Sequence, residues 1–96
     1  MGRIRIKVTV GNVYPPKPIR VFIDSKTNDK DDYEYKSPRS FDQEFEVPDG
    51  DYTITIAGMN QKNDKTDVDI TGDFSNPGAK SSAAPNYSLV YKGKIN

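Results

Sequence analysis

The 96-residue sequence contains no cysteine, no histidine and no tryptophan. Without cysteine there can be no disulfide framework, no zinc–thiolate site and no thiol chemistry. Without histidine the chain lacks the commonest general base and metal ligand of proteins. Acid pairs such as Asp49 and Asp51 flank an expected turn, where water keeps both carboxyl groups ionised and unsuited to acid–base catalysis. We therefore expect no cofactor and no enzymatic activity.

Hydrophobic residues are also scarce. They make up 33% of the chain, whereas roughly 45–50% is usual. No apolar run approaches the ~18 residues that a membrane-spanning helix needs, and no signal peptide is visible. We expect residues 1–96 to form a single domain with a lean core and no membrane insertion, and we interpret residues 1–2 as an expression remnant.

Charge is balanced in total but unevenly distributed. The 14 basic residues cancel the 14 acidic ones, yet residues 1–23 contain no acid. Arg3, Arg5 and Lys7 alternate with apolar residues, a pattern typical of the solvent face of one strand. We expect them to pair with acids of Asp42–Glu46 or Asp67–Asp69, and we favour this interpretation over a nucleic-acid patch.

Period-two alternation of apolar and polar residues recurs along the chain, and no helical stripe appears. Expected strands are Arg3–Val10, Ile19–Asp24, Asp32–Lys36, Phe41–Val47, Asp51–Gly58, Asp67–Thr71 and Tyr87–Ile95. Between the last two, Gly72–Asn86 is rich in Gly, Ser, Ala and Pro, which favours a mobile loop. The pattern predicts an all-β fold, an antiparallel β-sandwich of about seven strands.

The clearest local signal is FDQEFEVPDGDYTITIAG, Phe41–Gly58. Pro48 presets φ for the first position of a turn, and Gly50 can adopt the positive φ that a three-residue loop needs. Alternating β-branched and aromatic residues lie on both sides of this turn. The stretch therefore predicts a hairpin with one buried face.

The motif VPDGDYTITIAG resembles one found in bacterial immunoglobulin-like and fibronectin type III-like modules. Ile19–Ile56, with its F-x-V-P-x-G-x-Y-like hairpin, is similar to the prealbumin-like sandwich of carboxypeptidase regulatory-like domains. These resemblances imply a non-catalytic module of a secreted or cell-envelope protein, located outside the cell, in the periplasm or on the cell surface. They also imply that Tyr52 buries its ring and ties its hydroxyl to the neighbouring corner.

Two binding functions remain open. The first is a monomeric spacer, adhesion or protein-interaction domain, and the alternative is a carbohydrate-binding module that uses exposed tyrosines. The candidate binding residues are Tyr33, Tyr35 and Phe22, because aromatic rings bind protein or glycan surfaces at low entropic cost. We expect Tyr33 and Tyr35 to form a binding edge together with Gly72–Asn86. The competing interpretation is that both tyrosines pack over the core.

The acidic segment Asp24–Asp32, DSKTNDKDD, is a further candidate site. Oxygen ligands at this density can bind calcium. However, Lys26 and Lys30 interrupt the segment, and the glycine that folds an EF-hand loop around its ion is missing. We therefore expect no metal site.

Overall fold

A computed structural model describes residues 2–11, 18–27, 30, 32–60 and 64–96. These residues form eight strands, all paired antiparallel: β1 (Gly2–Val10), β2 (Ile19–Ser25), β3 (Tyr33–Ser37), β4 (Phe41–Val47), β5 (Gly50–Met59), β6 (Thr66–Gly72), β7 (Gly78–Ser82) and β8 (Asn86–Ile95). The prediction of an all-β antiparallel sandwich is confirmed. No described segment forms a helix that is long and apolar enough to cross a membrane.

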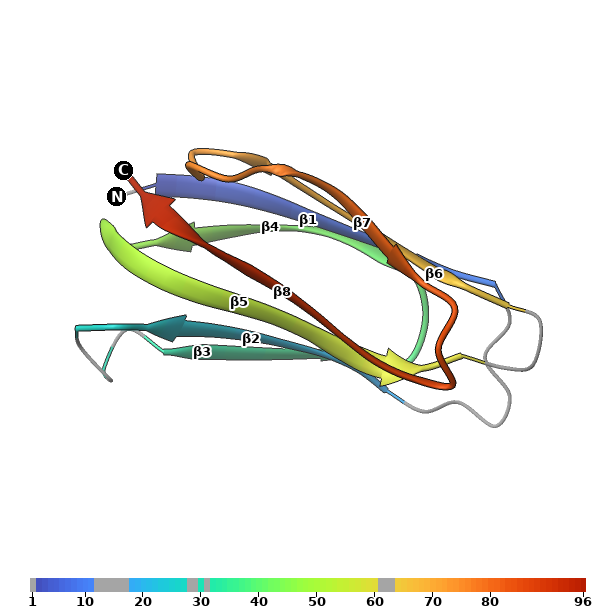
Figure 1. Cartoon of the computed structure of the whole chain (residues 1–96). Coiled ribbons are helices and arrows are strands. Elements are labelled where there is room, and N and C mark those ends of the chain that lie inside the picture. Colours follow the sequence, from blue (N-terminus) through green and yellow to red (C-terminus); the bar gives the residue numbers. More distant parts are fainter. Residues whose placement is uncertain (1, 12–17, 28–29, 31, 61–63) are drawn as a thin grey trace.

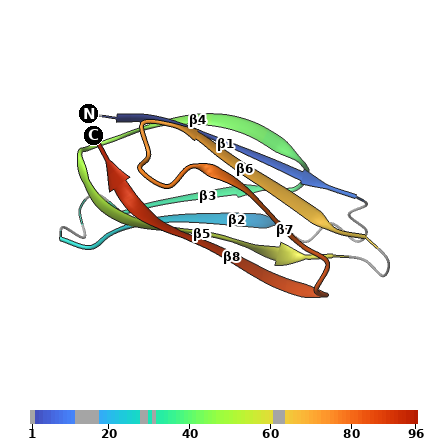
Figure 2. The ribbon, with the colours of Figure 1, turned by 45° about the horizontal axis from the view of Figure 1, so that its top comes forward.

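Two four-stranded sheets pack against each other (Figure 1). The first, here called sheet A, has the strand order β4-β1-β6-β7, and sheet B has the order β3-β2-β5-β8. The edge strands β3 and β4 therefore border one side of the sandwich, and the edge strands β7 and β8 border the other. The two chain ends lie together at one end of the sandwich in both views (Figures 1 and 2).

The core consists of the apolar residues that alternation turns inward on each strand. In β1 buried and exposed residues alternate strictly from Gly2 to Thr9. Such alternation hides one face of a sheet while the other stays in water. The most fully buried side chains are Tyr52, Ile4, Ile6, Ile19, Ile23, Ile54, Ile56, Ile70, Ile95, Val8, Val21 and Val68. The inward faces predicted for these strands are confirmed.

The hairpin predicted over Phe41–Gly58 is wrong. Val47, at the end of β4, pairs with Gly2 in sheet A, whereas Gly50, at the start of β5, pairs with Ile95 in sheet B. The connection therefore crosses from one sheet to the other. Alternation cannot distinguish these cases, because strands that face each other across a core and strands that pair in one sheet both bury every second residue.

The corner between β4 and β5 keeps the two local features that were predicted for it. Gly50 has a φ of 153°, a positive value that suits glycine. The Tyr52 side chain is fully buried, and its hydroxyl donates to the Pro48 carbonyl at 2.8 Å. The tyrosine thus fixes the corner from inside the core, as expected for its role.

The expectation that Gly72–Asn86 is a mobile loop is also wrong. It contains strand β7, which pairs with β6 from Thr66↔Ser82 to Ile70↔Gly78. Phe74 is buried and forms a β-bridge with Ile95. The sequence GAKSS of β7 carries no apolar alternation, so pairing with β6 rather than core burial defines this strand.

The basic residues of β1 lie beside the acids of β4, as predicted. The Arg5 guanidinium contacts the Asp42 carboxylate at 2.6 and 2.8 Å. Arg3 forms ion pairs with Glu44 (2.9 Å) and Glu46 (2.7 Å). All these side chains are largely in water, so each pair contributes little to stability. Their main effect is to neutralise the outer face of β1 and β4.

Candidate functional site

The open edge between β3 and β4 gathers aromatic rings from both sheets. On β3, Tyr33 pairs with Ile23 and Tyr35 pairs with Val21, both inward residues of β2. Cross-strand partners share a face of the sheet. The two tyrosines therefore point into the space between the sheets and not toward the outer surface.

Strand β4 supplies the opposite wall in the same way. Phe41 and Phe45 pair with the buried residues Val8 and Ile4 of β1, so their rings also turn inward. Ring centroids are separated by 5.6 Å for Tyr33–Phe45, 5.4 Å for Tyr35–Phe45 and 5.0 Å for Tyr35–Phe41. These are normal distances for interacting rings. The cluster joins the two sheets at an edge that no further strand covers among the described residues.

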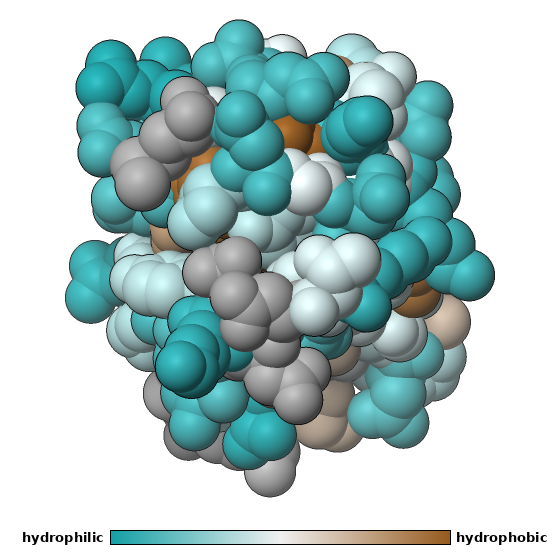
Figure 3. Space-filling view, turned by 90° about the vertical axis from the view of Figure 1, so that its left-hand side faces the viewer, coloured by the Kyte–Doolittle hydropathy of each residue, from teal (hydrophilic) through white to brown (hydrophobic). Residues whose placement is uncertain are grey.

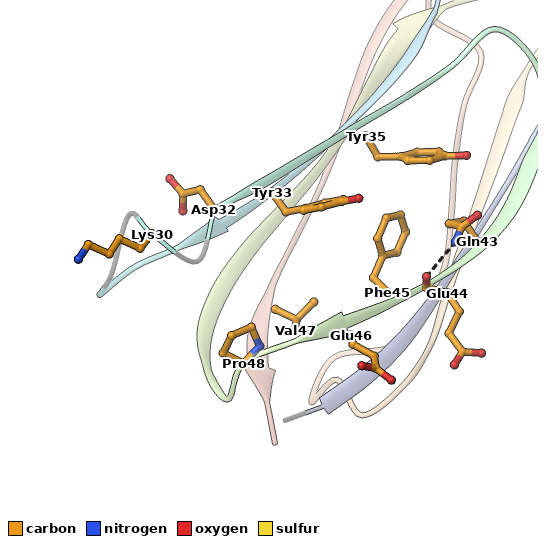
Figure 4. Close-up of a pocket in the computed structure, with 10 residues that line it drawn as sticks. All are labelled: Lys30, Asp32, Tyr33, Tyr35, Gln43, Glu44, Phe45, Glu46, Val47 and Pro48. Carbon is orange, nitrogen blue, oxygen red and sulfur yellow. Dashed lines mark hydrogen bonds between the residues drawn. The ribbon is translucent and has the colours of Figure 1, made fainter.

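A groove of about 390 Å³ lies over this cluster (Figure 4). It is lined by Tyr33 and Tyr35, by residues 43–48 and by Lys30 and Asp32. In the close-up, both tyrosine rings extend from β3 toward Phe45. Tyr33 remains 52% exposed, whereas Phe45 is buried. The groove thus has an apolar floor and one accessible aromatic ring.

The rim of the groove is polar. Glu44 and Glu46 point away from the rings in Figure 4, toward their ion-pair partner Arg3. The Gln43 side-chain amide donates to the Glu44 carbonyl at 3.0 Å. Figure 3, which views the end of the sandwich where the chain termini lie, is mainly hydrophilic, with hydrophobic residues visible in recesses.

Two carboxyl groups outside the lining of the groove have shifted pKa values. The hydrogen bond from Arg5 holds the pKa of Asp42 below its usual value. Burial, together with the nearby charge of Asp32, raises the pKa of Asp24. Asp32 itself accepts a hydrogen bond from the Ser25 N–H at 2.7 Å. Ion pairing therefore accounts for the shift of Asp42, and partial burial accounts for that of Asp24. Of these three carboxyl groups, Asp32 lines the groove.

The residues predicted to form a site come together only in part. Tyr33 and Tyr35 share the groove. Phe22 pairs with Glu34, at the opposite parity of β2, and so lies on the outer face of sheet B. The grouping of Phe22 with the tyrosines is therefore wrong. The segment Gly72–Asn86 is also misplaced, because β7 lies at the other edge of the sandwich from β3.

Sequence reasoning missed Phe41 and Phe45 as site residues. Their parity in the expected strand was visible, but it identified them only as core. The opposite charges of Arg3–Lys7 and Asp42–Glu46 indicated that these two segments lie side by side. The sequence contained no signal that this pairing places Phe41 and Phe45 opposite Tyr33 and Tyr35 on the facing sheet. The core-packing alternative for the tyrosines is half right, since Tyr35 is partly buried against the core cluster and Tyr33 is not.

The acidic candidates form no metal centre among the residues described. No three of their Asp and Glu side chains gather closely enough to hold an ion. Asn28, Asp29 and Asp31 of the Asp24–Asp32 segment lie outside the described residues. Elsewhere in the chain, Asp67 and Asp69 are exposed on β6, and Asp73 accepts a hydrogen bond from the Arg3 N–H at 3.0 Å.

The groove, its aromatic floor and its polar rim are therefore the features on which a functional assignment can rest. Comparison of the chain with protein-family models, with curated protein sequences and with solved structures gives no significant match.

Proposed function

We propose that this chain is a non-catalytic module of a secreted or cell-envelope protein, and that it binds another protein through the groove between β3 and β4. The observation that carries the proposal is the half-exposed Tyr33 ring, which stands against the buried Phe45 in a groove of about 390 Å³. The secreted or cell-envelope setting comes from the sequence resemblance alone.

The composition of the groove supports a protein ligand. Binding energy at protein interfaces concentrates in a few aromatic or arginine side chains surrounded by polar residues that exclude water. Tyr33 provides such an anchor, and its position is fixed by contact with Phe45 at 5.6 Å. The polar rim supplies hydrogen-bonding groups, including the amide of Gln43. An extended peptide fits the groove because β3 is an edge strand.

A non-catalytic role is supported by the orientation of the acids. Glycosidase chemistry needs two carboxyl groups facing each other across a cleft. Here Glu44 and Glu46 line the groove but form ion pairs with Arg3, and Asp32 is hydrogen bonded to the Ser25 backbone.

A carbohydrate ligand is the second candidate, and the exposed ring of Tyr33 favours it. Sugar rings stack on flat aromatic platforms. However, the planes of Tyr33 and Tyr35 make angles of 69° and 81° with Phe45, so the cluster is built from edge-on contacts. Tyr33 could stack on one sugar ring at most. The geometry therefore favours a peptide over an oligosaccharide.

The test is a binding screen by NMR with isotope-labelled protein, a panel of extended peptides and a panel of oligosaccharides. We expect peptides to shift signals of Tyr33, Tyr35 and Gln43, and Tyr33→Ser to weaken that binding about tenfold, the loss of one anchor. The matched control is Val90→Ser, which changes another exposed apolar side chain, on the opposite edge strand β8. It should bind like the wild type.

Two results would contradict the proposal. One is the absence of shifts across both panels at millimolar ligand. The other is binding that Tyr33→Ser and Val90→Ser weaken equally, which would place the ligand elsewhere. Shifts produced by oligosaccharides and not by peptides would replace the first candidate with the second.

A further inference from the structure

We propose that β3 pairs antiparallel with β3 of a second copy of this chain, about a two-fold axis that passes beside Tyr35. The inference rests on the proposed function, because it names a partner for the same edge of the sandwich. It depends on three observations: which backbone groups of β3 point outward, how the other edges are covered, and how charges are placed along β3.

The outward direction of the backbone can be read first on β8. Lys80 Nζ donates to the Val90 carbonyl (2.6 Å), and Asn76 Nδ2 donates to the Lys92 carbonyl. Ser75 accepts from the Lys94 N–H through its hydroxyl (2.8 Å). Backbone groups of successive residues in a strand point to opposite sides. Even-numbered residues of β8 therefore direct their backbone away from β5.

The registers carry this alternation across sheet B. Odd-numbered residues of β8 pair with even-numbered residues of β5, so odd-numbered residues of β5 face β2. The odd-numbered residues of β5 pair with even-numbered residues of β2, so the backbone groups of the odd-numbered residues of β2 face β3. Two hydrogen bonds agree with this assignment: the Lys26 N–H donates to the Asp51 carbonyl of β5, and the Ser25 N–H donates to Asp32, on the β3 side.

On β3, odd-numbered residues pair with odd-numbered residues of β2. The backbone N–H and C=O groups of Glu34 and Lys36 therefore point outward, away from the sheet. Among the described residues, no side chain and no loop backbone hydrogen bonds to these groups. Unpaired edge groups of this kind are a template for a further strand.

The other sheet edges are less suited to pairing with a second copy of the same strand. The outer edge of β8 is occupied by Lys80, Asn76 and Ser75, as described above. On β4, the Gln43 amide covers the outward carbonyl of Glu44. The edge strand β7 has the sequence GAKSS, whose small or charged side chains offer little apolar surface to a partner strand. Strand β4 also has open backbone groups and aromatic side chains, but Asp42, Glu44 and Glu46 on its outer face are all acidic, so a second copy of β4 would bring like charges together. Strand β3 combines open backbone groups and aromatic side chains with charges of both signs.

The charges on β3 match a second copy of the same strand. Glu34 and Lys36 lie on the outer face, 3.5 Å apart, on either side of Tyr35. Antiparallel pairing about Tyr35 places Glu34 opposite Lys36 of the second copy, and the reverse pair forms by symmetry. The backbone N–H and C=O groups of Glu34 then form reciprocal hydrogen bonds with those of Lys36 in the second copy, and those of Lys36 with Glu34. Parallel pairing in register would place like charges opposite each other, which is unfavourable.

The inner face gains apolar contact in the same arrangement. Tyr35 meets Tyr35 of the second copy, and Tyr33 lies opposite Ser37 of that copy. The axis keeps both copies of sheet A on one side, so the acidic β4 strands approach each other. Arg3 and Arg5 already hold the β4 acids in ion pairs of 2.6 to 2.9 Å, which limits the repulsion. The contact is short, so we expect weak, concentration-dependent association.

The test is sedimentation equilibrium of four proteins: the wild type, Glu34→Lys, Lys36→Glu and the double variant with both changes. We expect the wild type to dimerise at high concentration. Each single variant places like charges opposite each other twice and should weaken dimerisation about tenfold or more. The double variant restores both opposite-charge pairs and should dimerise like the wild type.

Mixing experiments separate specific pairing from net charge. An equimolar mixture of Glu34→Lys and Lys36→Glu should form heterodimers as tightly as the wild type forms homodimers. The control mixture combines Glu34→Lys with Lys92→Glu, an exposed change on β8 that alters net charge equally. It should associate more weakly, because one like-charge pair remains.

A wild type that stays monomeric at its solubility limit, or single variants that dimerise as well as the wild type, would overturn the inference. The proposed function would survive that result if peptides still shift the signals of Tyr33 and Tyr35. Dimerisation without binding to any peptide would support the inference and restrict the groove to self-association.

Discussion

At the scale of single residues, two glycines with positive φ differ in the room that their neighbours leave for a side chain. Gly72, at the end of β6, has a φ of 104°, and a Cβ there would clash with the Arg3 carbonyl oxygen. Gly78, at the start of β7, has a φ of 135°, yet a Cβ there would meet no atom within 4 Å. The two positions share backbone strain and differ in steric clash.

We predict that Gly78→Ala lowers the free energy of unfolding by about 1 kcal/mol, the cost of forcing a Cβ into positive φ. Gly72→Ala should lower it by at least ~2 kcal/mol more, because the obstacle is backbone and cannot rotate away. Urea denaturation of both variants measures the difference. Equal losses would show that β1 and β6 can separate locally at little cost.

Predictions for single residues were correct where the residue type has a well-defined structural role. The positive φ of Gly50 followed from the turn residues beside it, the role of Tyr52 at the corner was implied by the family resemblance, and both are confirmed. Phe22 was misjudged because its aromatic side chain suggested grouping with Tyr33 and Tyr35. Parity along β2 placed it on the other face of the sheet, and parity was available from the sequence.

At the scale of elements, alternation predicted which segments are strands but not which strands pair. Phe41–Val47 was recognised as a strand, and its charges correctly indicated β1 as a neighbour, but the turn signal at Pro48 and Gly50 wrongly indicated a hairpin with β5. Strand β7 was missed, because GAKSS has no apolar residue to bury and depends on pairing with β6. The groove therefore could not be predicted, since it exists only because β4 and β3 end up on facing sheets.

The pairing of β1 with β4 also predicts a response to acid. Arg5 holds the pKa of Asp42 below its ordinary value, chiefly through their hydrogen bonds. The folded state then binds the proton more weakly than the unfolded state. The stabilisation is present above the unfolded pKa and is lost as pH falls through the lowered folded pKa.

We predict that Arg5→Gln is slightly less stable than the wild type at neutral pH, and that this difference disappears well below pH ~4. The measurement is the free energy of unfolding of both proteins across that range. Arg20→Gln is the control, because Arg20 is exposed on β2 and no described residue forms an ion pair with it. A difference for Arg5→Gln that is constant with pH would contradict the ion-pair explanation.

At the scale of the whole molecule, the sandwich is held by contacts between distant parts of the chain. Gly2 pairs with Val47, Ile4 pairs with Gly72, and Gly50 pairs with Ile95. Each such contact closes a long loop before any burial compensates for the lost entropy. The cross-sheet corner at Pro48 removes the local hairpin that would have offered an early, short-range pairing.

We predict that refolding from urea is slow for a domain of this size, in the range of milliseconds to seconds, as is typical of all-β sandwiches. Stopped-flow tyrosine fluorescence can follow it, since buried Tyr52, Tyr87 and Tyr91 report on core formation. Refolding that is complete within microseconds would mean that a local pairing, such as β6 with β7, drives folding and the long-range contacts do not limit it.

The two chain ends lie side by side, and Gly2 is so close to Ile95 and Asn96 that a Cβ at Gly2 would touch both. A short linker could therefore join residue 96 to residue 2, and the chain could be opened instead at the exposed connection 38–40 without losing a strand. The same proximity suits insertion into a loop of a host protein. In such a setting the sandwich would be attached to its host at one end and would not separate two neighbouring domains.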